Sequence, residues 1–273
     1  MSLQDIWSTS RVCKGAVDKE ESRPYTGGCL ALRSPNKDIR LSADVMHIDG
    51  HMFLVSVAAP LQLTLQSHTE NESRTSLGMA LQGQLGTFRS RGFVPRIVYT
   101  DPHSTFRAMT EDFPGVEIDP GGKGDYVPQV DAKIRRKKDT YRKVQKGLPW
   151  TLPHVLVGDL VGYAVSRLNA RRTTSLEGNV CPRVLFTGRP LEFKKEFWLA
   201  FGDYVEAYEG TTNTMTARSM ACITLCPANN STVAWVMWKI ATRSRIRRSN
   251  WVKLVTTQLI IDAMNAIARE SGE

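Results

Sequence analysis

Residues 41–57 read LSADVMHIDGHMFLVSV, and this stretch decides the fold class. Apolar and polar residues alternate over 41–48, which predicts a half-buried strand. The Asp-Gly pair that follows is a strong signal for a hairpin turn, so residues 52–57 are predicted to return as a second strand. Asp44 lies inside the first strand, where a carboxylate costs free energy unless it is paired or holds a metal.

The sequence after this hairpin alternates between helix and strand patterns. Apolar residues recur every three or four positions over 72–88, which predicts a helix, and 94–100 is a β-branched strand that ends at Asp101. The C-terminal end of a strand is the usual place for functional groups in an open α/β sheet. Asp131 falls in the first turn of a helix that begins near residue 128. If the first and later strands are neighbours, the three aspartates converge.

Converging carboxylates repel one another, and a hard divalent cation relieves that repulsion. Mg²⁺ is typically held by a few carboxylates, and paired ions of this kind support phosphoryl transfer. Each aspartate also has an ordinary structural explanation. Asp44 could cap a turn or pair with an arginine, Asp101 precedes a proline as turn-starting residues do, and Asp131 suits a helix N-terminus. The residues alone leave both interpretations open.

Composition excludes several classes of protein. The 273 residues suffice for one large domain or two modest ones, and 41% hydrophobic residues indicate a globular chain. No apolar run approaches the 18 residues of a membrane span, and the N-terminus has no secretory pattern, so we expect neither a membrane protein nor a secreted one. Five cysteines imply no disulfide framework.

The net charge is +9, with 36 Lys and Arg against 27 Asp and Glu. Most of this excess lies in two segments, 132–146 and 239–253, which are either solvated faces or contacts for a polyanion such as nucleic acid. On the helix predicted to begin near residue 128, Asp131, Arg135 and Lys138 share a face, so the acid and the two cations can contact the same DNA backbone. The predicted nucleic-acid-binding residues are Lys133, Arg135, Arg136, Lys138, Arg142, Arg245, Arg247 and Arg248.

Four segments in this order resemble the catalytic core of retroelement integrases, a branch of the RNase H-like superfamily. They are residues 41–57, IVYTDPHSTF at 97–106, GDYVPQVDAKIRR at 124–136 and VGYAVSRLNARRT at 161–173. LTR retrotransposons match best. PRVLFTGRPLEF at 182–193 and LAFGDYVEAYEGT at 199–211 are similar to the segment after the core in copia-type integrases, where a small β-barrel follows.

The resemblance covers roughly residues 40–255 and implies both a fold and a chemistry. The implied fold is α/β, an RNase H-like three-layer core with a mixed five-stranded sheet followed by a small β-barrel-like domain. Asp44, Asp101 and Asp131 would be the catalytic residues and would bind Mg²⁺ or Mn²⁺. The implied activity is cutting and joining DNA ends. The implied partners are double-stranded element ends and target DNA, with a homo-oligomer as the active form, located in the nucleus or in the cytoplasm before import.

The sequence patterns and the resemblance together predict five parts of the chain. They are an irregular lead-in at 1–38, the core at 39–172, a linker at 173–190, the small β domain at 191–256 and a C-terminal helix at 257–273.

Two motifs depart from the integrase pattern. The family usually has Asp-Asn-Gly where this chain has Asp101-Pro102-His103, and its third acid is usually Glu, whereas Asp131 is one methylene shorter. These departures favour an alternative, a catalytically decayed or domesticated nucleic-acid-binding protein that keeps the integrase fold. A third hypothesis is an RNase H-type nuclease that acts on a heteroduplex.

Overall fold

The structure of the protein is a computed structural model that describes residues 37–101, 104–121, 128–173, 176, 180–210, 218–228 and 234–272. Most of the predicted lead-in lies outside the described residues. So do Pro102, His103 and all but the first residue of the glycine loop predicted at 121–124.

The first sheet has five strands in the order β3-β2-β1-β4-β5. Their bounds are β1 (Asp38–Ile48), β2 (His51–Ala59), β3 (Leu63–Thr69), β4 (Val94–Thr100) and β5 (Glu117–Pro120). β1, β2 and β3 pair antiparallel, whereas β4 runs parallel to β1, and β5 parallel to β4. The predicted hairpin joins β1 to β2 through Asp49 at φ 44° and Gly50 at φ 76°, the positive values that a tight two-residue turn requires.

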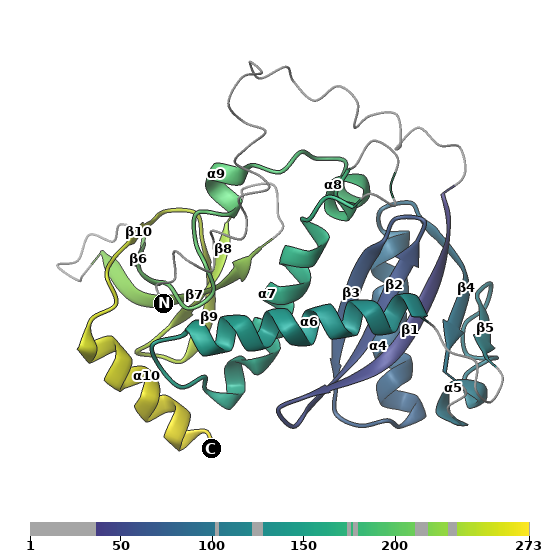
Figure 1. Ribbon diagram of the computed structural model, residues 1–273, viewed down its shortest axis with the longest axis horizontal. Coiled ribbons are helices and arrows are strands. Elements are labelled where there is room, and N and C mark those ends of the chain that lie inside the picture. The colour runs from purple at the N-terminus through teal and green to yellow at the C-terminus, as the bar shows by residue number, and fades with distance from the viewer. Residues whose placement is uncertain are drawn as a thin grey trace.

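Helices cover both faces of this sheet (Figure 1). They are α4 (Arg74–Arg89), α5 (Ser104–Ala108), α6 (Pro128–Gly147), the short η1 (His154–Leu156) and α7 (Val157–Asn169). Alternation along each strand separates two cores. Leu41 and Leu54 pack with the buried side of α4, while Phe53 and Val55 pack with α6 and α7. The predicted α/β class, a three-layer core with a mixed five-stranded sheet, is therefore confirmed.

A second, all-antiparallel sheet follows, in the order β10-β6-β7-β8-β9. Its strands are β6 (Tyr204–Tyr208), β7 (Ser219–Pro227), β8 (Trp235–Lys239), β9 (Ser244–Arg248) and β10 (Trp251–Lys253), and α10 (Gln258–Glu270) comes after them. The predicted small β domain is thus present as a five-stranded sheet. Within the described ranges, no helix combines the length and apolarity needed to cross a membrane.

The segment at 173–190, predicted as a linker, contains folded structure. It holds α8 (Pro182–Thr187), whose Leu185 is buried with Val180 in the same core as α4. Next comes α9 (Phe193–Glu196), whose Glu196 is buried and pairs with Arg183. This connection therefore packs against the core of the first sheet and is not a free linker between the two sheets.

The two sheets share one hydrophobic core. A single cluster contains Phe53 of β2, Tyr141 of α6, Leu160 of α7 and Trp235 of β8. α7 supplies buried side chains to this cluster and lies between the two sheets in Figure 1. Burial of apolar surface is the main favourable term in folding, so the sheets stabilise each other.

Leu160→Ala tests this shared core. Leu160 is fully buried, so we expect the substitution to lower the free energy of unfolding by about 2–5 kcal/mol. Denaturant unfolding followed by far-UV circular dichroism and by tryptophan fluorescence should give one coincident transition. Met79→Ala, at a position that is 65% exposed on α4, is the control and should change stability little. Two separate transitions would contradict a common core.

Candidate active site

Asp44 and Asp101 lie side by side on neighbouring strands. β1 and β4 are parallel, and Ala43 pairs with Thr100, so the next residues along the two strands are the two aspartates. Adjacent strands lie about 4.8 Å apart. Asp44 also shares a face of β1 with Met46, which packs in the core under α6. The carboxylates therefore both belong to the face of the sheet that α6 covers.

Asp131 reaches the same place from the first turn of α6. The helix begins at Pro128, and proline suits a first helical turn because its missing N–H would be unbonded there anyway. Asp131 is half-buried, and its charge acts on both Asp44 and Asp101. The structure thus brings the three predicted acids into one neighbourhood.

Burial raises the pKa of Asp44 to about 6, and the negative charges of Asp101 and Asp131 push it in the same direction. Two interactions oppose the shift: the Val45 N–H donates to Asp44 Oδ1 at 2.7 Å, and Lys138 contributes a positive charge. Burial, followed by the charge of Asp131, also raises the pKa of Asp101. Mutual repulsion of this kind is what a bound cation relieves.

Lys137 is a functional candidate that the sequence analysis missed. It lies on the buried stripe of α6, between Ile134 and Tyr141, and its side chain is fully buried. Within the part of the chain that the structure describes, its Nζ has no hydrogen-bond partner. Burial holds the pKa of Lys137 well below its ordinary value, Lys133 lowers it further, and the charge of Asp44 opposes this. The apolar spacing around position 137 was the available signal.

The predicted DNA-binding residues of α6 divide into two groups. Arg135, Arg136 and Arg142 are exposed, as solvent- or DNA-facing side chains must be. Lys138 is half-buried and acts on Asp44, which places it beside the acids. Lys133 is half-buried as well, and its Nζ donates to the Gln62 carbonyl at 3.4 Å.

The arginines predicted on the second sheet differ in how free they are. Arg245 donates to both carboxylate oxygens of Asp159 at 2.7–3.1 Å and lies over the Trp238 ring, so its guanidinium joins β9 to α7. Arg248 donates to the Tyr208 carbonyl at 3.1 Å. Arg247 is exposed. DNA contact by these three side chains stays a prediction, and Arg245 would have to give up its ion pair to make it.

The donor set has the chemistry of a divalent-metal site. Carboxylate oxygens are what Mg²⁺ and Mn²⁺ prefer, and the charges of Asp101 and Asp131 add to the effect of burial in raising the pKa of Asp44. The acids are not drawn together into a closed ligand set: among the described residues, no three His, Cys, Asp or Glu side chains form a group able to hold a metal. Residues 102–103 and 122–127, which adjoin Asp101 and precede α6, are outside those described.

Comparison with known proteins gives likeness of structure alone. The sequence matches no known protein family and no curated protein. Among solved structures, the chain is similar to the catalytic core domain of BIV integrase, with a TM-score of 0.42 and 16% identity over 55% of this chain and 93% of that one. It is also similar to the HTLV-2 integrase catalytic core domain solved with magnesium, with a TM-score of 0.42 and 14% identity over 54% and 95%. Similarity at this level assigns no activity.

Lys137→Met tests the buried amine. A folded-state pKa below the ordinary 10.5 means that the unfolded chain binds the proton more tightly, so wild-type stability rises with pH through that window. We expect the variant to be more stable at pH 7 by about 1–3 kcal/mol, and the gap to shrink toward pH 10. Chemical denaturation at both pH values measures this, with the exposed Lys146→Met as control. A variant less stable at pH 7 would show that the amine has a stabilising partner.

Asp44→Asn tests the repulsion among the acids. A carboxyl whose pKa is raised on folding favours the folded state below its unfolded value of 3.8 and loses that contribution as the pH rises through 6. The variant should therefore melt a few degrees higher than wild type at pH 8, with the gain vanishing near pH 4. Melting curves in EDTA measure this, with Asp139→Asn on the exposed face of α6 as control. An equal gain at both pH values would rule out titration of Asp44 as the cause.

Proposed function

We propose that the protein is a divalent-metal-dependent polynucleotidyl transferase that cuts and joins DNA ends, in the manner of a retroelement integrase. The observation that carries this proposal is the meeting of Asp44, Asp101 and Asp131 on the α6 face of the first sheet, where burial and then the charges of the other two acids raise the pKa of Asp44. A structural role for one aspartate does not require the other two beside it.

The three acids have distinct supports. Asp44 is fixed by the middle of β1, Asp101 by the end of β4 and Asp131 by the first turn of α6. They would hold Mg²⁺ or Mn²⁺ together. When bound, a divalent cation supplies Lewis-acid activation and neutralises charge in phosphoryl transfer. Because the three supports belong to one packed core, the carboxylates are oriented before substrate arrives, which lowers the entropic cost of the reaction.

The exposed side of α6 supplies the DNA-binding surface in this proposal. Asp131, Arg135, Lys138 and Arg142 follow one another at spacings of four, three and four residues, so they form one stripe along the helix. A phosphate backbone that lies along this stripe meets three cations and ends at the acids. Such contacts fix the position of DNA without reading its sequence.

Further features of the proposal come from the sequence resemblance. The preferred substrate is double-stranded DNA, namely the ends of an element and a target. The proposed relatives are the integrases of copia-type LTR retrotransposons. Joining two ends to a target requires more than one active site, so the active form is a homo-oligomer. The basic stretches of 133–138 and 243–248 would direct the protein to the nucleus.

The proposal is tested with labelled DNA duplexes, RNA and DNA–RNA hybrids incubated with Mg²⁺ or Mn²⁺. We expect wild type to cleave duplex DNA and to join its ends, with activity abolished by EDTA. Asp101→Asn should lower the rate by about 100-fold or more, because Asp101 would supply a ligand to the divalent metal. DNA affinity in EDTA should stay unchanged, because no metal is bound there. Asp262→Asn, at an exposed acid on α10, should retain full activity and serves as the control.

Each of the other possible outcomes supports a different function for the protein. Salt-sensitive DNA binding without product from wild type would contradict the transferase and favour the decayed binding protein, since phosphate contacts release counterions. Cleavage confined to the hybrid would favour the RNase H-type nuclease. Equal activity of wild type and Asp101→Asn would place the chemistry elsewhere.

A further inference from the structure

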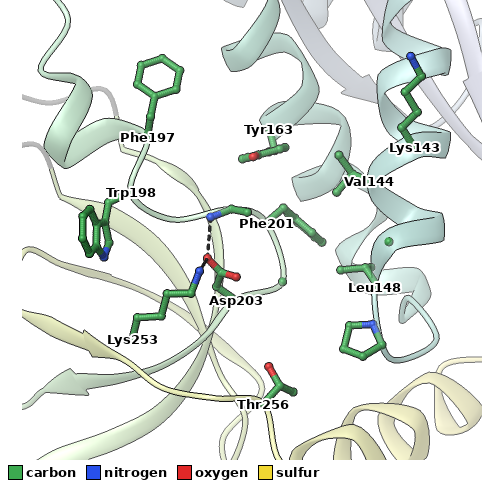
Figure 2. Close-up of a pocket in the computed structure, with 14 residues that line it drawn as sticks. Lys143, Val144, Leu148, Tyr163, Phe197, Trp198, Phe201, Asp203, Lys253 and Thr256 are labelled. Atoms are coloured by element: carbon green, nitrogen blue, oxygen red, sulfur yellow. Dashed lines mark hydrogen bonds and ion pairs between the residues drawn. The ribbon is translucent and has the colours of Figure 1, made fainter. Parts of the chain in front are cut away.

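A pocket of about 380 Å³ opens where the C-terminal end of α6 meets the second sheet (Figure 2). Its walls come from Val144 of α6, Leu148 directly after α6, Tyr163 of α7 and Phe201, which precedes β6. The volume lies within the range of small-ligand pockets. None of the three acids lines it, so it is a separate feature of the molecule.

Two local contacts hold this pocket in shape. Gly202 has φ 88°, a conformation that L side chains rarely adopt, and a Cβ there would come within 2.3 Å of Leu148 Cδ2, so this wall favours glycine at position 202. The Arg167 guanidinium lies 4.6 Å from the Tyr163 ring centroid and 4.5 Å from that of Phe197, and it donates to two backbone carbonyls of the same wall. The aromatic lining is therefore preformed.

The mouth of the pocket combines an exposed aromatic ring with positive charge. Trp198 is 63% exposed, which is unusual for so large an apolar side chain. Figure 2 shows Trp198 and Lys253 on one side of the pocket and Lys143 on the other. Lys253 is neutralised by Asp203, since its Nζ lies 2.7 Å from Asp203 Oδ2. Lys143 is exposed and supplies the cation of the opposite rim.

The distance from the acids suits a strand of nucleic acid. Asp131 and Lys143 are 143 − 131 = 12 residues apart on one helix, which is about 18 Å at 1.5 Å per residue. A stacked strand advances about 3.4 Å per nucleotide along the helix axis, so this length spans about five nucleotides at most, and fewer where the strand is unstacked and extended. The basic stripe of α6 covers the interval between the two places.

We propose that the pocket receives an unpaired nucleobase of a DNA strand, up to about five nucleotides from the phosphate at the three acids. This inference rests on the proposed function and names the form of its substrate, a DNA end with a single-stranded extension. A base offers a flat π-face to Trp198 and its neighbours. The phosphates of the strand that carries this base face Lys143 and the rest of α6. An apolar peptide would gain nothing from the cationic rim.

The test is DNA binding without catalysis, measured in EDTA by fluorescence anisotropy. Two labelled duplexes are compared, one blunt and one with a five-nucleotide single-stranded extension. Wild type should bind the extended DNA more tightly, and Trp198→Ala should lower that affinity about tenfold or more while changing blunt-duplex affinity less than twofold. Tyr208→Ala removes an aromatic side chain that is 42% exposed and lies outside the pocket, and it should change neither affinity.

The inference is overturned if wild type binds both DNAs equally, or if Trp198→Ala weakens both by the same factor or neither. Circular dichroism and the melting temperature of Trp198→Ala confirm that the variant is folded. Because no metal is present, the binding result does not depend on cleavage. Preferential binding in EDTA, together with no cleavage when Mg²⁺ or Mn²⁺ is supplied, would refute the transferase and leave the pocket assignment standing. Absence of DNA binding by wild type would refute both.

Discussion

The burial of a carboxylate in the middle of β1 is the constraint on which the rest of the structure depends. Asp44 lies under α6, where removal from water raises the free energy of its charged form. The chain surrounds it with two further acids and with Lys137 and Lys138 of α6. Acids and bases meet there within one packed core, and the half-buried carboxylate of Asp44 is more costly to ionise there than in water. Such an arrangement costs stability, which proteins tolerate where chemistry requires it.

α6 connects this constraint to the rest of the molecule. Its first turn carries Asp131, its buried stripe contacts the first sheet and its last turn lines the pocket beside the second sheet. α7 shares the hydrophobic core of both sheets, and Arg245 ties β9 to α7 through Asp159. Packing and ion pairs therefore set the position of the second sheet relative to the acids. As a result, the acids and the pocket keep a fixed separation along α6.

Local patterns predicted those parts of the fold that local physics decides. The alternation at 41–48, the Asp-Gly turn and the β-branched stretch at 94–100 correspond to β1, its hairpin and β4. α8 escaped prediction because its six residues are too few to show a periodicity and Leu185 packs on a core formed by distant segments, although Pro182 in the first turn and Gly188 at φ 68° mark its two ends. Tertiary context decides such short elements.

The candidate site was predictable to the same extent. The resemblance named the three acids, and strand register accounts for two of them meeting, but that register joins residues 57 positions apart in sequence and no local pattern fixes it. The ion pair of Arg245 with Asp159 spans 86 positions, so an arginine that appeared free in the sequence is engaged in the structure. Lys137 was hidden for the opposite reason, because a lysine on a buried stripe contradicts the usual preference of lysine for solvent.

The central claim is that Asp44, Asp101 and Asp131 together bind a divalent cation. Crystals of the protein soaked in Mn²⁺ and measured at the manganese absorption edge test it most directly. The account predicts an anomalous peak within about 2.0–2.4 Å of oxygens from Asp44 and Asp101, with Asp131 as a further ligand, and loss of that peak in Asp44→Asn. A saturating soak that leaves these carboxylates without a peak, or an unchanged peak in the variant, would contradict the account.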